Sequence, residues 1–384
     1  MSEGKVKRKI IFLIFAAVMV VAGGCGTDGG DTEASRDLFA MDTYMTVTAY
    51  GKGATEAVDQ AADEISRLDQ LLSTGNEDSE IYKINWSGDG ILSEETAYLV
   101  ERSLDLYEAT DGAFDIAIYP VMKAWGFTDD NFRVPDADEL KDLLTLTDAS
   151  DISYDKETSQ IAFKKDGMQI DFGGIAKGYT SARIMDIFRA CGIKSGLVNL
   201  GGNVQALGTK KDGSSWRVAV QDPQDTDQYL GVLSIQDKAV ITSGGYERYF
   251  EQDGRTYHHI IDPKTGYPVE NGLISVSIVT ADGTLADGLS TSVFIMGKEA
   301  ATEYWRNHSD EFDMILMTDD REIYVTEGIA DSFESEMDTK IIEKKYKRMI
   351  WYGDKYEKYL EKYFRNCTRH SGSGGGNWCS GFPE

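Results

Sequence analysis

The spacing of apolar residues along the chain predicts four helices. Between residues 55 and 72 the apolar positions recur at spacings of three and four, which is typical of a helix with one buried face: Val58, Ala61, Ile65, Leu68 and Leu72. The same analysis predicts three further helices, at residues 94–109, 178–191 and about 284–301.

Runs rich in β-branched and aromatic residues predict the strands. They lie at residues 44–50, 152–155, 160–163, 195–202 (a strand with its turn), 216–223, 229–244 and 274–281. Runs of strands thus alternate with a few long helices. This arrangement is typical of an α+β fold.

The first residues are interpreted as a processing signal. A basic start at residues 5–9 precedes an apolar run at residues 10–21, which is too short to predict a spanning helix. Small residues then lead into Cys25 and resemble a bacterial lipobox, in which that cysteine is lipidated and holds the protein at a membrane surface. The alternative is an ordinary export signal with an incidental cysteine.

Four segments follow from these patterns. Residues 1–24 are the predicted lipoprotein signal peptide, 25–36 a polar tether, 37–337 the main folded domain and 338–384 a tail. The tail is first basic and aromatic and then glycine-rich, in contrast to the acidic body. We interpret it as a solvated appendage; contact of its lysines and tyrosines with a membrane surface is the alternative.

Net charge excludes one class of partner. The formal charge is −26, and a chain this acidic repels polyphosphate backbones, so no nucleic-acid partner is expected. An anionic small ligand would need a local lysine, a helix N-terminus or a metal ion to offset this field.

Asp287 and Thr291 lie four residues apart in a predicted helix, so their side chains share one face. A carboxylate and a hydroxyl, joined by a carbonyl and by phosphate oxygens of a ligand, suit Mg²⁺, which rarely uses an all-protein cage. The alternative is a capping box from Thr284 to Asp287, in which Asp287 only secures the helix start. On spacing alone the cap is favoured.

Residues 171–179 form a second candidate element, between a strand-like run and a helix. Gly173 and Gly174 allow the backbone to approach a ligand closely, and the helix N-terminus beyond them favours anions. Lys177 can meet a phosphate as a point charge, although no Lys-Ser/Thr pair of a P-loop follows. Taken alone, the segment is better interpreted as a tight turn with a surface lysine.

Three further patterns carry candidate chemistry, each with a structural alternative. His259 precedes a strong turn signal at residues 262–266 and can act as a proton acceptor, although a hydrogen-bonding role is more common. Phe114 and Asp115 can stack on and hydrogen-bond a ring system, although a buried phenylalanine after a turn explains the pattern better. The segment 199–203 is interpreted first as a turn.

In their order these segments resemble the ApbE family, the FAD:protein FMN transferases. The resemblance covers roughly residues 37–333 and includes MDTYMTVTAY, DGAFDIAIYP, DFGGIAKGY, LVNLGGN, ITSGGYERYF, HIIDPKTGYPV and ADGLSTSVFIMG. It implies a T-fold-like α+β single catalytic domain, often a lipoprotein on the extracytoplasmic side of the bacterial cell envelope. It also implies Mg²⁺-dependent cleavage of FAD, with transfer of FMN through a phosphoester to a threonine of an acceptor protein, typically a subunit of a membrane redox complex.

The resemblance assigns roles to individual residues. Those implied to contact FAD are Met41, Ala113, Phe114, Asp115, Asp171, Lys177 and the main chain of Ile261. Mg²⁺ would be held by the carbonyl of Gly174 and by Asp287 and Thr291. His259 matches the family histidine and is the candidate base, while Lys177 would neutralise phosphate charge.

The chain departs from the family pattern at one position of the presumed FAD site. Many members carry a tyrosine after LST, where this chain has Gly75. Without that ring, water would reach the phosphates more easily, so a Mg²⁺-dependent FAD pyrophosphatase that releases FMN and AMP is an alternative function. A lipid-anchored flavin-binding protein without catalysis is a third, although flavin capture alone requires no metal.

Overall fold

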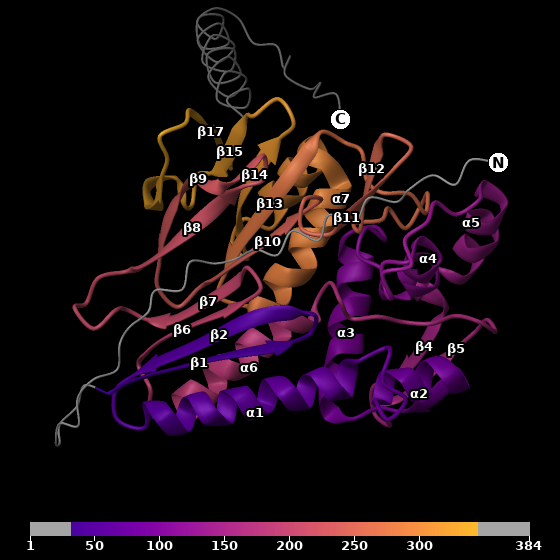
Figure 1. Cartoon of the computed structure of the whole chain (residues 1–384), viewed down its shortest axis with the longest axis horizontal. Coiled ribbons are helices and arrows are strands. Elements are labelled where there is room, and N and C mark those ends of the chain that lie inside the picture. The colour runs from indigo at the N-terminus through magenta and orange to yellow at the C-terminus, as the bar shows by residue number, and fades with distance from the viewer. Residues whose placement is uncertain (1–31, 345–384) are drawn as a thin grey trace, which may run out of the picture. The chain divides into compact units, whose positions relative to one another are not determined.

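A nine-stranded sheet forms the centre of the fold (Figure 1). The computed structural model describes residues 32–344, and the sheet lies in the compact unit that ends at Ile342. Its strands follow the order β1 (Glu33–Ala40), β2 (Thr43–Tyr50), β6 (Ser195–Leu200), β7 (Asn203–Gly208), β10 (Ala239–Gly244), β13 (Leu273–Thr280), β14 (Asp313–Thr318), β15 (Ile323–Thr326) and β17 (Thr339–Ile342). Neighbouring strands are antiparallel except β15 and β17, which pair in parallel.

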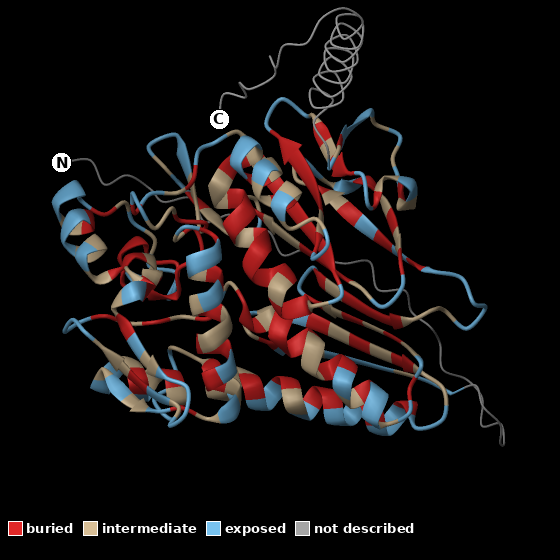
Figure 2. Cartoon of the chain, turned by 180° about the vertical axis from the view of Figure 1, so that it is seen from behind, coloured by how far each residue is buried: buried red, intermediate tan, exposed pale blue. Residues whose placement is uncertain are grey.

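Three long helices pack on one face of this sheet. They are α1 (Ala54–Leu72), α6 (Ala176–Ala190) and α7 (Gly283–Asn307). The five apolar positions that predicted α1 are all buried in it, and Figure 2 shows its buried and exposed residues alternating along the helix. Each large apolar side chain buried in this way contributes about 1.5–3 kcal/mol, which explains why the apolar spacing located the helix so closely.

A three-stranded sheet packs on the opposite face. It consists of β16 (Phe333–Glu334), β9 (Asp225–Ile235) and β8 (Trp216–Asp222). Trp216, Val218 and Leu233 from this small sheet share one core cluster with Val240 and Ile315 of the large sheet. Strands and helices are therefore combined in one unit, and the predicted α+β class is confirmed.

The remaining elements form a region beside α7 (Figure 1). Its helices are α2 (Glu80–Ser87), α3 (Glu94–Ala109), α4 (Tyr119–Trp125) and α5 (Ala137–Leu143), with short 3₁₀ turns at Ile116–Ile118, Leu144–Leu146 and Ala149–Asp151. The strands of this region are β3 (Asp89–Ile91), β4 (Ile152–Asp155) and β5 (Gln160–Phe163), and a hairpin of β11 (Tyr249–Gln252) and β12 (Arg255–His258) lies close by. Outside this region, a further 3₁₀ turn, Ala330–Ser332, precedes β16. The predicted hairpin at 152–163 and the helix at 94–109 are both present.

The structure corrects the predicted domain boundaries at both ends. Strand β1 begins at Glu33, inside the predicted tether of residues 25–36, and β17 lies inside the predicted tail of residues 338–384. Both segments pair with strands of the large sheet, which composition did not reveal. Cys25, the signal segment and most of the tail lie outside the described residues. Among residues 32–344, no helix is both long enough and apolar enough to cross a membrane.

Helix α7 also differs from its prediction. It continues to Asn307, past the predicted end near 301, and its backbone leaves helical geometry at Gly297, where φ is 77° and ψ is 166°. Asn271 donates its side-chain amide to the carbonyls of Phe294 and Ile295, at 2.7 and 3.2 Å. The break therefore has an identifiable cause, a glycine conformation with its freed carbonyls satisfied from outside the helix.

Candidate active site

The start of α7 decides between the two interpretations of Asp287. Asp282 is the N-cap, and its Oδ1 accepts hydrogen bonds from the amides of Thr284 and Leu285 at 2.9 and 3.1 Å. Thr284 therefore lies inside the helix, and the capping-box interpretation of Asp287 is wrong. The pattern was misleading because a second acidic residue five positions earlier performs the capping.

Asp287 instead points away from its own helix. It is 4% exposed, and its Oδ2 accepts a hydrogen bond from the amide of Gly178 in the first turn of α6 at 2.8 Å. Its Oδ1 accepts from Nδ2 of Asn203, at the start of β7, at 3.0 Å. Asp287 thus ties α7 to α6 and to the β6–β7 turn, and Asn203 is a site residue that the sequence analysis treated only as part of a turn.

The two helix starts touch through backbone atoms. A Cβ placed on Gly178 would lie 2.1 Å from the carbonyl oxygen of Gly283, and one placed on Gly283 would lie 2.8 Å from the carbonyl oxygen of Gly178. Only glycine permits this approach, and it is what brings Asp287 within reach of the α6 amide.

Thr291 lies one turn beyond Asp287, on the side of the Gly173–Gly174 turn. Its Oγ1 is 3.4 Å from Oγ of Ser243, and a Cβ placed on Gly174 would be 3.7 Å from the same Oγ1. Ser243 in turn lies 2.7 Å from Oγ of Ser290. The three predicted metal ligands, Gly174, Asp287 and Thr291, therefore gather where α7 meets the start of α6.

Lys177 lies in the first turn of α6 and is half-buried. Its ammonium makes no hydrogen bond or ion pair within residues 32–344. Its charge opposes the burial that raises the pKa of Asp171 and of Glu247, and it adds to the burial that lowers the pKa of His259. A free cation at a helix N-terminus is arranged to meet an anionic ligand.

Asp171 precedes the glycine turn and accepts the amide of Gly173 at 2.5 Å. The protein around this half-buried carboxyl raises its pKa by desolvation, against the lowering effect of that hydrogen bond and of Arg248 and Lys177. The predicted pair of Asp171 and Lys177 therefore lies within electrostatic reach.

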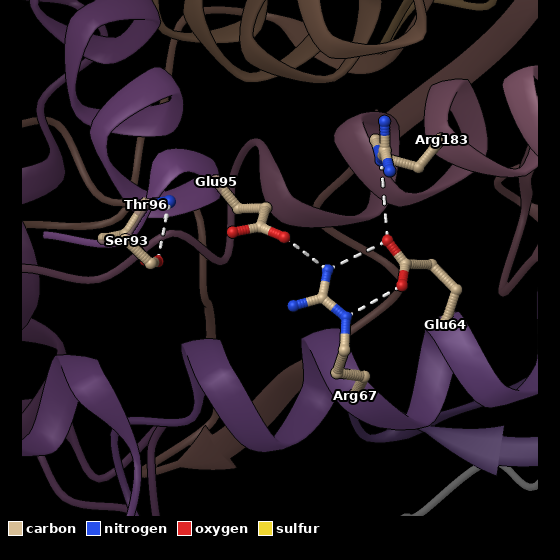
Figure 3. Close-up of polar contacts among 6 residues, drawn as sticks. All are labelled: Glu64, Arg67, Ser93, Glu95, Thr96 and Arg183. Carbon is tan, nitrogen blue, oxygen red and sulfur yellow. Dashed lines mark hydrogen bonds and ion pairs between the residues drawn. The ribbon is translucent and has the colours of Figure 1, made fainter.

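A network of charged side chains links α6 to α1 and α3 (Figure 3). Arg67 of α1 binds Glu64 through Nε at 2.8 Å and Glu95 at the start of α3 through Nη2 at 2.6 Å. Arg183 of α6 reaches the same Glu64 at 3.5 Å. Ser93 begins α3 by accepting the amide of Thr96. The network ties the helix that carries Lys177 to two neighbouring helices.

His259 directly follows β12. Both its amide and its Nδ1 contact the carbonyl oxygen of Arg248, at 3.0 and 3.1 Å. A carbonyl only accepts, so Nδ1 carries the hydrogen and Nε2 is the unprotonated nitrogen. Desolvation lowers the pKa of His259 to about 3, with further lowering by His258 and by the charges of Arg248 and Lys177, against the raising effect of the hydrogen bond to the Arg248 backbone. The ring is therefore neutral at pH 7 and can accept a proton at Nε2.

Glu247, which the sequence analysis did not single out, lies within electrostatic reach of Lys177 and Asp287. Its side chain is exposed, yet protein atoms surround it closely enough that desolvation raises its pKa to about 7; Lys177 opposes this effect and Asp287 adds to it. Its place in the turn between β10 and β11 brings it near both residues. The acidic residue within the segment YER was the available signal.

Met41 forms the turn between β1 and β2, with φ of 48°. Its amide donates to Asp69 at 3.0 Å, and its sulfur lies 3.8 Å from Oγ1 of Thr180 on α6. These contacts hold Met41 against the helix that carries Lys177, the position that its predicted contact with FAD requires.

Gly75 lies on an exposed turn after α1. Its amide donates to Oγ of Ser73 at 3.2 Å, and a Cβ placed on it would meet no atom within 4 Å. Burial raises the pKa of the nearby Tyr119, the Thr74 side chain opposes this rise, and the charge of Asp171 adds to it. The turn therefore lies near Asp171, with open space in place of a ring.

The segment from Ala113 to Asp115 is buried. Phe114 is 4% exposed, and its ring lies against the glycine turn, 3.2 Å from a Cβ placed on Gly174. Asp115 caps a 3₁₀ turn by accepting the amide of Ala117 at 2.7 Å, and burial raises its pKa to about 6. Phe114 thus packs against the Gly173–Gly174 turn, in line with the structural alternative of a buried phenylalanine. Asp115 lines a separate cavity.

That cavity has a volume of 540 Å³. It is lined by residues from α3, the Gly112 loop, the turn at 147–148 and the turn after β12, among them Asp115, Asp148 and Lys264. Ile261 is 4% exposed and bridges to Pro268 within the last of these turns, whose predicted geometry at 262–266 is present. Asp115 and Pro263, two residues after Ile261, therefore line the same cavity, whereas Met41 and Lys177 are not among its lining residues.

The donor set matches a hard cation. Among the described residues, no group of three or more histidine, cysteine, aspartate or glutamate side chains is arranged to hold a metal ion. The candidate set is of another kind, one carboxylate, one hydroxyl and one carbonyl. Each oxygen of Asp287 accepts a single hydrogen bond and so keeps a lone pair for a cation. Oxygen donors that leave positions for phosphate are what Mg²⁺ uses.

This geometry defines a class of site, in which a lysine at a helix N-terminus lies near oxygen donors of the kind that suit a hard cation and an anionic ligand. The chain belongs to the ApbE family, whose family model matches residues 41–316. It is 33% identical over 339 residues to the FAD:protein FMN transferase of Treponema pallidum (strain Nichols), covering 83% of this chain and 93% of that protein. It is 34% identical to the FAD:protein FMN transferase of Klebsiella pneumoniae (strain 342), over 68% of this chain and 82% of that protein.

Solved structures show the same fold. The ApbE protein of Thermotoga maritima aligns with a TM-score of 0.74 and 31% identity, over 78% of this chain and 99% of that one. The apo form of the flavinyl transferase ApbE of Pseudomonas stutzeri aligns with a TM-score of 0.71 and 28% identity, over 80% and 99%. The predicted family and fold are confirmed.

Proposed function

We propose that this protein is an FAD:protein FMN transferase, which cleaves FAD with Mg²⁺ and attaches FMN to a threonine of an acceptor protein through a phosphoester, releasing AMP. One observation carries the proposal: Asp287, Thr291 and Gly174 meet at the start of the helix that bears Lys177. The names of the similar proteins from Treponema and Klebsiella support the transfer of FMN from FAD to a protein.

The reaction requires one bond to form and one to break. The threonine oxygen bonds to the phosphorus of the FMN half, and the phosphorus–oxygen bond to AMP breaks with its electron pair leaving on AMP. A bound Mg²⁺ would supply charge neutralisation on the phosphate oxygens. Asp287, Thr291 and the Gly174 carbonyl would hold it.

The residues of the chain then have separate tasks. Lys177 and the N-terminus of α6 bind the pyrophosphate, which offsets the acidic field of the protein. Nε2 of His259 takes the proton of the acceptor hydroxyl, because Nδ1 is engaged with Arg248. The phosphate charge that FAD brings opposes the desolvation that lowers the pKa of His259, and so makes it a stronger base.

Two alternatives involve the same residues. The open space at Gly75 favours water as a competing nucleophile, so FAD hydrolysis to FMN and AMP is the second candidate. Flavin binding without turnover is the third, and it does not explain why oxygen donors converge beside Lys177.

We also propose that lipid on Cys25 anchors the enzyme on the extracytoplasmic side of the bacterial membrane. The acceptor would be a subunit of a membrane redox complex on the same side. The support is the sequence of the N-terminal segment and the family resemblance. Labelling with a radioactive fatty acid, compared between the native chain and Cys25→Ala, tests the anchor.

One incubation separates the three candidate functions. The protein is mixed with FAD and Mg²⁺, with and without a threonine-containing acceptor peptide, and AMP, FMN and peptide-bound flavin are quantified. Covalent flavin on the peptide supports transfer. AMP with free FMN, unaffected by the peptide, would establish hydrolysis, and unchanged FAD would leave only binding.

A further inference from the structure

Two exposed aromatic side chains stand at the end of the β1–β2 hairpin. Phe39 is 63% exposed and Tyr44 is 70% exposed. They are cross-strand partners, and their rings meet edge to face at 5.1 Å and 72°. The other exposed large apolar side chains of residues 32–344 do not form ring pairs with one another. Such a pair on an otherwise polar surface marks a binding surface more often than a lone aromatic does.

Next to this pair, the same hairpin face is polar. Farther from the turn, Thr46 donates to Asp37 at 2.6 Å, and the hydroxyls of Ser35 and Thr48 lie 2.9 Å apart. These side chains follow the alternation that places Phe39 and Tyr44 outward, away from buried Met45. The aromatic pair is therefore confined to the turn end of the hairpin, and the fold does not bury it.

The turn between the two aromatics is attached to the candidate active site at two points. Met41 contacts Thr180, which lies one turn after Lys177 on α6. Asp42 lies 4.0 Å from the guanidinium of Arg248, the residue whose carbonyl fixes His259. The hairpin end, seen beside β6 in Figure 1, thus joins the two elements that carry the proposed phosphate-binding and proton-accepting groups.

We propose that Phe39 and Tyr44 form the docking surface for the acceptor protein and contact apolar side chains that flank its flavin-accepting threonine. The inference rests on the proposed transfer, because an enzyme that modifies a protein must hold the segment around the modified residue. A membrane is the other possible occupant of an exposed aromatic pair. Asp37 and Asp42 flank the pair and the chain carries a net charge of −26, so anionic lipid is repelled while an apolar or basic peptide is not.

Synthetic peptides provide the test, because they need no knowledge of the natural acceptor. Two peptides of identical length each carry one central threonine, flanked by leucines in one and by serines in the other. Both are labelled for fluorescence anisotropy and are also assayed for covalent flavin. The wild type is compared with the double variant Phe39→Ser/Tyr44→Ser and with the control Tyr229→Ser, which removes a 62% exposed tyrosine from β9.

The wild type is expected to bind the leucine peptide about tenfold more tightly than the serine peptide, as for a small aromatic hot spot. The double variant should lose that preference, while the control keeps it. FAD affinity and AMP release without peptide should be the same in all three proteins.

Several results would overturn the inference. An unchanged preference in the double variant would do so. Equal loss of FAD affinity would place the pair in the flavin site, and loss of binding to anionic vesicles with an intact peptide preference would assign it to the membrane. Because anisotropy needs no turnover, a protein that binds the leucine peptide through the pair but never forms covalent flavin would refute the proposed transfer and leave the docking surface standing.

Discussion

Two aspartates at the start of α7 offer a matched pair of substitutions. Asp282 caps the helix, whereas Asp287 points to the amide of Gly178 and to Asn203. We predict that Asp282→Ala lowers stability and leaves turnover intact. Asp287→Asn is predicted to abolish Mg²⁺-dependent turnover and leave the protein folded.

The magnitudes follow from the contacts of each carboxylate. Asp282→Ala removes two amide acceptor contacts and an ion pair with Arg102 at 3.3 Å, which should cost about 1–2 kcal/mol of unfolding free energy. In Asp287→Asn the amide oxygen still accepts one hydrogen bond, and the other donor loses its acceptor at a cost of about 1–3 kcal/mol. Removal of a buried charge offsets part of that loss. Turnover should fall by at least about 100-fold, as for the loss of one electrostatic group at a reacting phosphate.

The assay follows AMP release from FAD at increasing Mg²⁺, alongside thermal unfolding of each variant with and without Mg²⁺. The wild type and Asp282→Ala should gain stability from Mg²⁺ by mass action, and Asp287→Asn should not. The reasoning is refuted if Asp287→Asn retains turnover and Mg²⁺-dependent stabilisation, or if Asp282→Ala is the variant that loses them.

Three further predictions concern single residues. In His259→Asn the side-chain amide can still donate to Arg248 but offers no base, so transfer should fall by about 100-fold to 10,000-fold while FAD binding is kept. Since the folded pKa of His259 lies near 3, below the unfolded value of 6.5, stability is lost as pH falls through that interval, and pH-dependent unfolding of His259→Asn should show a smaller loss. Glu64→Gln should cost at most about 1 kcal/mol at pH 7 in denaturant unfolding, because Arg67 holds the pKa of Glu64 below 4.5 and the contribution is lost as pH falls below that value. Gly297→Ala should lower the unfolding free energy by about 1–3 kcal/mol without changing the KM for FAD, because a side chain strains the backbone at φ 77°.

Each of these predictions has a contrary result. Equal losses of transfer and FAD binding in His259→Asn would argue against a base. A Glu64→Gln stability difference that grows on acidification would contradict the sign of its pKa shift. Full stability of Gly297→Ala would show that α7 can continue through the break.

Apolar spacing located the four longer helices, as for α1, where one buried face decides the position, but it did not predict the short helices α2, α4 and α5. It could not locate β1 or β17, which are mostly exposed and are held by main-chain pairing with a neighbour distant in sequence. Most of the candidate site residues were available from the family resemblance, and the local patterns alone favoured a cap for Asp287. The capping by Asp282 is a local contact with the amides two and three residues later, which the sequence analysis overlooked. The hydrogen bond of Asn203 to Asp287, and the charge effects of Lys177 and Asp287 on Glu247, depend on the packing of elements distant in sequence, which no local pattern encodes.

The backbone contact between Gly178 and Gly283 has a consequence for the thermal inactivation of the protein. Two helices that meet without intervening side chains have no rotamer with which to adjust, so their junction is either assembled or lost. On heating, enzymatic activity and the folded structure should therefore be lost at the same temperature, with no folded but inactive intermediate.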